Sequence, residues 1–161
     1  MKVAALFWLG AIALVGAGVT QPPPARSQNA VKVDVVAVHA FSENRGARVF
    51  DKDLQDLKEA LSDLEYDTFR RLSATTLRAA LNQEATYEIN SRYKICVKPL
   101  SREPSGQVRL NVRVEMKTGA ARAKPINAIT TTLLIGPEKK LKLRGLKLDN
   151  GELVVVLMLR G

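Results

Sequence analysis

Alternation of hydrophobic and polar side chains predicts most of the strands of this chain. In residues 107–117 (QVRLNVRVEMK), valine, leucine and methionine occupy one phase, and arginine, asparagine, glutamate and lysine the other. Successive side chains of a strand point to opposite faces of the sheet, so one face of this strand belongs to the core and the other meets water. Residues 93–98 alternate in the same way. We expect Pro99 and residues 104–106 to mark the turn between these two strands.

The C-terminal residues predict a hairpin. Residues 139–148 and 152–160 are joined by Asn150-Gly151, a pair that favours a type I′ turn, which needs positive φ at both central positions. The leucines of residues 139–148 change phase at Gly145, which indicates a β-bulge. The last strand is apolar on both faces, so we expect it in the middle of a sheet.

Three further segments are expected to contain strands, and the third leaves an alternative open. Residues 31–41 and 126–135 are rich in β-branched side chains and are predicted strands. Residues 66–89 leave two possibilities for their first half, a strand or a short second helix, followed by a turn near Asn82 and a short strand.

One segment has helical spacing. Leucines at 54, 57, 61 and 64 recur three or four residues apart, with acids and lysines between them, and Asp51 precedes them as a candidate N-cap. The sequence therefore predicts an α+β, mainly β fold: an antiparallel sandwich or curved sheet of about 7–8 strands with one packed helix at about 51–64.

The N-terminus has the order of a secretory signal. Lys2 is followed by an apolar run and then by small residues, so we expect a signal peptide over 1–18 with cleavage after Ala17 or Gly18. The alternative is a retained membrane anchor, because residues 3–19 form an apolar stretch of 17 residues. Residues 19–30 contain three prolines and read as a linker, which leaves residues 31–161 as a single β-rich domain.

Cys96 is the one cysteine, so the chain cannot form an intramolecular disulfide or take a lipid at its N-terminus. The absence of disulfide staples, together with the signal, favours a bacterial periplasmic or secreted protein. Membrane contact is expected only if the N-terminal segment is retained.

Several segments carry a resemblance to known sequences. They are the spacing of Asp51, Leu54 and Leu57, the segments 66–72 and 97–100, and the terminal hairpin with its Val-Val-Val-Leu run. Over residues 51–160 the chain resembles a family of small exported bacterial proteins with a signal peptide and one β-rich domain. That resemblance implies export and the fold, and it brings no activity, cofactor or ligand.

Charge is distributed unevenly along the chain. The net charge is +9 for the whole chain, while residues 31–65 alone carry −3. If the strands at 107–117 and 139–148 share a sheet, their cations would form a ladder facing an anionic partner. The candidate residues for that surface are Arg109, Arg113, Lys117, Lys140, Lys142 and Arg144.

Residues able to carry chemistry are sparse. His39 is the single histidine and has no motif partner, so we interpret it as a structural or surface residue. We expect an inert thiol at Cys96, because no catalytic signature surrounds it. No nucleotide-binding, hydrolase or metalloprotease motif occurs in the sequence. We therefore expect no enzyme activity, no metal and no cofactor; a hydrolase would need Cys96 beside His39 or a cleft of carboxylates.

These observations predict an exported, non-enzymatic binding or accessory domain of the bacterial cell envelope. Its partner would be a protein or an anionic envelope polymer. Nucleic acid is disfavoured, because export removes the chain from the cytoplasm and aromatic side chains for base stacking are few. The alternative is a membrane-anchored subunit of an envelope assembly with the N-terminal helix retained.

Overall fold

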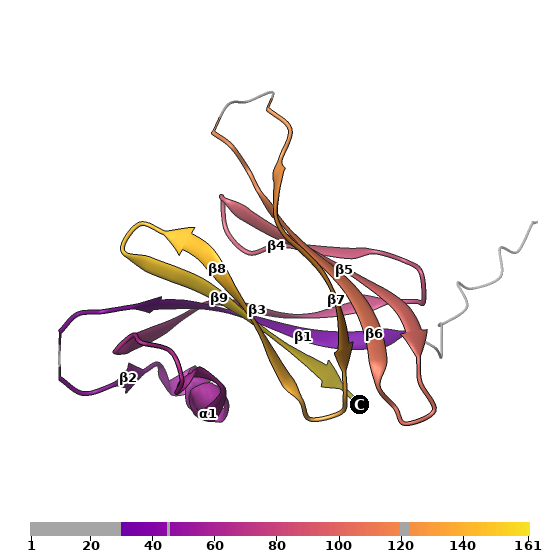
Figure 1. Cartoon of the computed structure of the whole chain (residues 1–161), viewed down its shortest axis with the longest axis horizontal. Coiled ribbons are helices and arrows are strands. Elements are labelled where there is room, and N and C mark those ends of the chain that lie inside the picture. Colours follow the sequence, from indigo (N-terminus) through magenta and orange to yellow (C-terminus); the bar gives the residue numbers. More distant parts are fainter. Residues whose placement is uncertain (1–29, 45, 120–122) are drawn as a thin grey trace, which may run out of the picture.

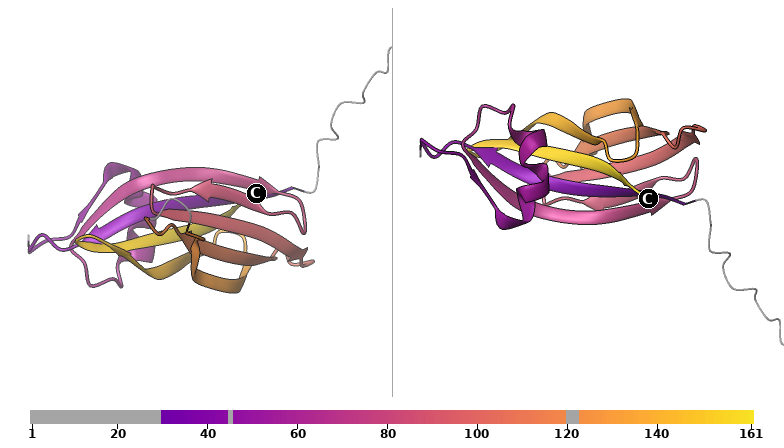
Figure 2. Two further views of the ribbon diagram at one scale, coloured as in Figure 1. Left: turned by 90° about the horizontal axis from the view of Figure 1, so that it is seen from above. Right: turned by 90° about the horizontal axis from the view of Figure 1, so that it is seen from below.

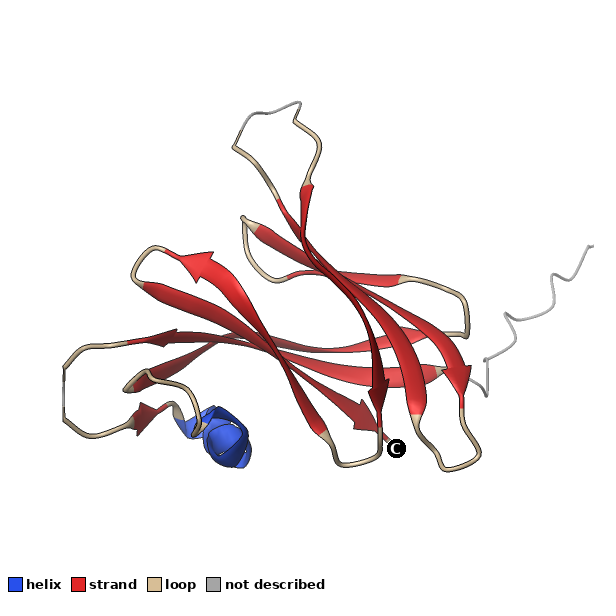
Figure 3. Ribbon diagram, viewed as in Figure 1, coloured by secondary structure: helices blue, strands red, loops and turns tan. Residues whose placement is uncertain are grey.

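The computed structural model describes residues 30–44, 46–119 and 123–161, and these residues form a two-layer β-sandwich with a short helical segment on one side (Figures 1 and 3). The predicted mainly β class is confirmed. Nine strands occur in the described residues: β1 (Val31–Phe41), β2 (Val49–Phe50), β3 (Thr68–Ala79), β4 (Ala85–Glu88), β5 (Tyr93–Arg102), β6 (Val108–Met116), β7 (Ile126–Ile135), β8 (Lys140–Leu148) and β9 (Gly151–Arg160).

The strands form two sheets. In the described chain, sheet A has the order β2-β3-β1-β9-β8, and sheet B has the order β4-β5-β6-β7. All neighbours pair antiparallel except β2 and β3, which are parallel. The apolar β9 lies between β1 and β8, which confirms its predicted central position.

The main core lies between the two sheets (Figure 2). Its members share the inward phase of their strands, so the alternation in 107–117 is confirmed: Val108, Leu110, Val112 and Val114 are buried there. Sheet A contributes β-branched and leucine side chains from β1, β8 and β9, and Ile95 and Val97 enter from β5.

The helical segment is shorter and more tightly wound than predicted. A 3₁₀ helix (Lys52–Leu57) leads into a single α-helical turn, α1 (Lys58–Leu61). Leu54 and Leu57 lie three residues apart, which fits the three-residue turn of a 3₁₀ helix, whereas Leu57 and Leu61 are spaced for an α-helix. All four leucines, Leu64 included, pack on the outer face of sheet A and form a second core with Val38, Ala40, Phe69, Val154 and Val156.

Asp51 precedes the helical segment but does not cap it with its side chain. One carboxylate oxygen of Asp51 instead accepts a hydrogen bond from the backbone N–H of Arg71 at 2.8 Å, and its own N–H donates to the carbonyl of Phe69 at 3.0 Å. The predicted capping bond is therefore wrong, because the neighbouring strand β3 takes the carboxylate.

The segment 66–89 consists of strands. β3 covers half of it, Asn82 has a positive φ of 64° in the turn, and β4 follows. The turn predicted near Asn82 and the short strand after it are confirmed, and the structure places a strand where a second helix was the alternative.

The β8–β9 hairpin is confirmed, but its turn is not of the predicted type. Leu148 pairs with Gly151, so Asp149 and Asn150 are the loop residues, and none of these loop residues has a positive φ. Gly151 is required for space: a Cβ there would lie 2.2 Å from the carbonyl oxygen of Ala40. Glycine thus lets β9 approach β1 closely.

Two of the register shifts between strands bear on the predictions. Gly145 has a φ of 90° where the β8–β9 register shifts, which confirms the predicted bulge. Its N–H donates to a carboxylate oxygen of Glu152 at 2.5 Å. The turn expected at Pro99 is not observed. Pro99 sits instead within β5 beside a register shift, a position where the strand ladder tolerates a residue without an N–H.

The predicted signal peptide and all of the predicted linker except Ala30 lie outside the described residues. Among the helices that are described, none is long and apolar enough to cross a membrane.

Candidate interaction surface

The outer face of sheet B is the broad sheet face that no element of the described chain covers. The inner faces of both sheets form the main core, and the helical segment packs on the outer face of sheet A. In Figure 2 the helical segment lies on the sheet A side of the molecule. The register aligns the side chains of the outer face of sheet B in rows across β4–β7: Thr86, Glu88, Lys94, Cys96, Lys98, Arg109, Asn111, Arg113, Glu115, Thr130, Thr132 and Leu134.

An ion-pair network occupies one half of this face. The Glu115 carboxylate accepts hydrogen bonds from Lys94 Nζ at 2.8 Å and from Arg113 Nε at 2.9 Å. Arg113 also reaches Glu84 at 3.2 Å, and Lys117 pairs with Glu88 at 2.6 Å. The cations of this half of the face are therefore balanced by carboxylates of the same sheet.

The network also sets the ionisation of its members. The hydrogen bond from Lys94 is the main cause that lowers the pKa of Glu115, with Arg113 adding to it. Burial raises the pKa of the Cys96 thiol, and the nearby Glu115 carboxylate raises it further; Cys96 Sγ lies 3.8 Å from Glu115 Oε1. A buried thiol with a raised pKa has little thiolate at neutral pH and is a poor nucleophile.

The six predicted cations do not form one ladder, because β6 belongs to sheet B and β8 to sheet A. Arg109 and Arg113 share the outer face of sheet B, and Lys117, one residue past the end of β6, pairs with Glu88 on that face. The β8 cations are engaged elsewhere: Lys140 donates to the carbonyl of Asp56, Lys142 pairs with Asp63, and Arg144 lies 3.5 Å from Glu152. One of these cations, Lys142, is thus paired with the acidic segment 51–65, and Arg144 is paired with β9.

Two cations on the outer face of sheet B stand outside this network. Within the described residues, neither Arg109 nor Lys98 forms an ion pair, and Arg109 is exposed. They lie diagonally on β6 and β5, since Lys98 pairs with Asn111, and Arg109 with Ser101. The alternation in residues 93–98 predicts that Lys98 points outward, but only the sheet register places it beside Arg109. Glu103 lies at the same end, where its carboxylate accepts a hydrogen bond from Ser101 Oγ at 3.4 Å.

His39 and Cys96 do not form a catalytic pair. His39 pairs with Leu153 on the side of sheet A that faces sheet B, whereas Cys96 lies on the far side of sheet B. His39 stacks on Phe41 with ring centroids 4.5 Å apart, and its Nε2 atom is buried without a hydrogen-bond partner among the described residues. Burial lowers the pKa of His39 below 6.5, while a hydrogen bond with Asn150 opposes the shift.

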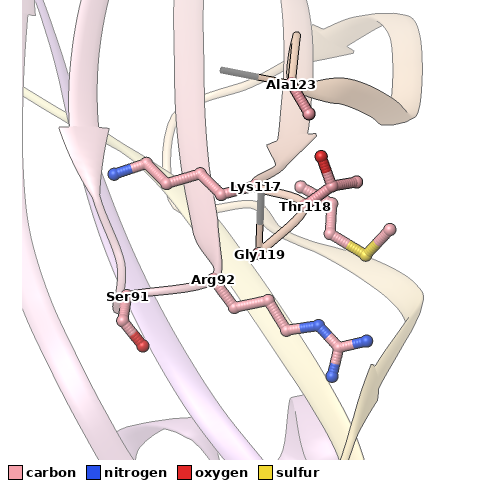
Figure 4. A pocket seen from close by; sticks show the side chains of 7 residues that line it. Ser91, Arg92, Lys117, Thr118, Gly119 and Ala123 are labelled. Atoms are coloured by element: carbon pink, nitrogen blue, oxygen red, sulfur yellow. The ribbon is translucent and has the colours of Figure 1, made fainter. Parts of the chain in front are cut away.

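A hollow of about 810 Å³ lies at one end of sheet B, lined by the residues in Figure 4. The Lys117 ammonium and the Arg92 guanidinium point away from each other across it. Lys117 is paired with Glu88, and Arg92 lies 5.7 Å from the ring centroid of Tyr93. The two cations therefore do not converge on a point where an anion could bind both.

No group of three or more His, Cys, Asp or Glu side chains that could hold a metal ion occurs in the described parts of the chain. Comparison with known proteins identified no matching family model, no matching curated protein and no matching solved structure.

Proposed function

We propose that this chain is an exported, non-enzymatic binding domain of the bacterial cell envelope, and that its partner docks on the outer face of sheet B. The observation that carries this proposal is the exposure of that face, since sheet faces without a cover are candidate contact surfaces. Export rests on the N-terminal sequence and on the resemblance, over residues 51–160, to a family of small exported bacterial proteins.

The open end of this face fits an acidic partner. Lys98 and Arg109 supply positive charge, and Asn111 and Thr132 supply hydrogen-bonding groups beside them; Asn111 donates to Thr132 Oγ1 at 3.4 Å. Because the rest of the face is neutralised by its own carboxylates, the expected footprint is an acidic patch of a protein or envelope polymer and not a long polyanion laid across six cations.

The test is a charge reversal with a matched control. The Lys98→Glu/Arg109→Glu variant changes the charge of the outer face of sheet B. The Lys139→Glu/Lys147→Glu variant changes the net charge equally, at two exposed positions away from that face: Lys139 lies in the turn before β8, and Lys147 lies on β8. Binding is measured by sedimentation with purified phosphate- or carboxylate-bearing cell-wall polymer and by affinity capture from periplasmic extract.

We expect the first variant to lose binding about 10-fold or more and the control to keep it. Binding by the wild type should also weaken as salt rises to physiological strength, where the Debye length is about 8 Å. Equal loss in both variants would mean nonspecific charge attraction, and unchanged capture by the first variant would remove the outer face of sheet B from the proposal.

A further inference from the structure

The edge strand β7 differs from the other sheet edges of the described chain. β2 has two residues and β4 has four, while β8 carries Lys140, Lys142, Arg144 and Lys147 and the Gly145 bulge. Short length, lysines and bulges are the usual protection of an edge against pairing with another chain. β7 has ten residues (INAITTTLLI) with no charged side chain and no proline, and its one register shift against β6, next to Ile129, leaves residues 129–135 in regular pairing.

β7 also exposes apolar side chains. Ile126 is 51% exposed and Leu134 45%, and Ile129 and Leu133 are half-buried although they pack against the main core. β7 ends and β8 begins at the turn 136–139, and the two strands diverge from this turn (Figure 1). No described strand pairs with the second edge of β7. The backbone N–H and C=O groups on this edge of β7 therefore have no partner strand among the described residues, and they lie beside exposed apolar side chains.

We propose that β7 pairs antiparallel with β7 of a second copy of this chain, so that two copies of sheet B join into one continuous sheet across a two-fold axis. This inference does not depend on the proposed function, which uses the face of sheet B and not its edge. The interface would be isologous, because the same strand serves on both sides.

The sequence around β7 is complementary to itself in one register. With Thr131 opposite Thr131 of the partner copy, Ile129 comes opposite Leu133 and Thr130 opposite Thr132, so apolar side chains and threonines meet their own kind. No charged side chain lies within β7, so this register opposes no like charges along the paired strands.

The basic character of the chain does not oppose this pairing. On the neighbouring strand β6, the cations that face β7 are Arg109 and Arg113, opposite Leu134 and Thr130. Two β6 strands would stand three strand spacings apart, about 14 Å. That distance exceeds the Debye length of about 8 Å at physiological ionic strength, and Arg113 is already paired with Glu84 and Glu115.

The first test measures the oligomeric state of the full chain by sedimentation equilibrium over a concentration series. Thr130→Lys/Thr132→Lys sets lysines opposite lysines at two exposed positions on each copy, and we expect it to weaken dimerisation about 10-fold or more. Mixing it with Thr130→Glu/Thr132→Glu should restore the dimer, as a mixed pair. Thr86→Lys, at an exposed position on the opposite edge of sheet B, is the matched control and should remain dimeric.

The second test fixes the register. Cα atoms directly opposite in an antiparallel pair are about 4.5–5.5 Å apart, within the range that a disulfide bridges. Thr131→Cys should therefore form a disulfide-linked dimer on mild oxidation, whereas Thr86→Cys should not, and the native Cys96 is buried. Circular dichroism establishes that each variant is folded.

Three results would overturn the proposal: a wild type that is monomeric at its highest soluble concentration, a lysine variant that dimerises as well as the wild type, or no cross-link through Thr131→Cys. A monomer in which amide exchange of β7 speeds up on removal of residues 1–29 would assign the edge to the chain's own N-terminal segment instead.

Discussion

At the scale of single residues, neighbouring positions of β6 have opposite roles. Val112 is fully buried between the sheets, whereas Arg113 is partly exposed and ion-paired on the outer face of sheet B. Val112→Asp places an unpaired carboxylate in the core and should cost more than ~3 kcal/mol, a large part of the stability of a small domain. Arg113→Gln should cost less than ~1 kcal/mol, because Glu115 keeps Lys94 as its partner. Urea unfolding of both variants measures the difference, and equal losses would show that the two faces of β6 are assigned wrongly.

His39 predicts a pH dependence of stability. Its pKa in the folded protein lies below 6.5, so the unfolded chain binds the proton more readily, and stability falls as pH drops below 6.5 toward the folded pKa. His39→Gln removes this contribution. Between about pH 7.5 and about pH 5.5, the melting temperature of the wild type should therefore fall further than that of the variant. An identical fall in both proteins would mean that His39 titrates normally.

At the scale of elements, local patterns predicted strands well and their partners poorly. Alternation in 107–117 identified both faces of β6, because a two-residue period depends only on neighbouring positions. No local pattern indicates which sheet a strand joins. The prediction of a single ladder of six cations is therefore wrong, because β6 and β8 belong to different sheets. The leucine spacing at 54–64 likewise fitted an α-helix and a 3₁₀ turn alike, and packing on sheet A decided between them.

The β1–β9 contact gives a prediction at this scale. Gly151→Ala would bring a methyl group within 2.2 Å of the Ala40 carbonyl oxygen and 2.8 Å of Phe41 Cβ, so the two central strands must separate. We expect a loss of about 1–3 kcal/mol in the free energy of unfolding. Gly119→Ala is the control, since nothing lies within 4 Å of its added Cβ. Equal stability of the two variants would contradict the close approach of β9 to β1.

At the scale of the whole molecule, β8 is joined to the acidic helical segment, while the outer face of sheet B and the edge of β7 are the two separate surfaces that we propose as contact sites. Lys142 with Asp63, and Lys140 with the Asp56 carbonyl, tie β8 to the helical segment. Part of the uneven charge visible in the sequence is thus paired within the fold. What remains for partners is local: Lys98 and Arg109 on the face, and uncharged backbone at the edge.

The proposed role in the cell envelope depends first on export, and the mature N-terminus tests export most directly. The chain is produced in a bacterium, the cytoplasmic, membrane and periplasmic or secreted fractions are separated, and the intact mass of the chain is measured in each. Export with cleavage predicts a chain that begins at Gly18 or Val19 in the periplasmic or secreted fraction. A chain beginning at Met1 in the membrane fraction would favour the anchored alternative, and a full-length chain confined to the cytoplasm would contradict an envelope role.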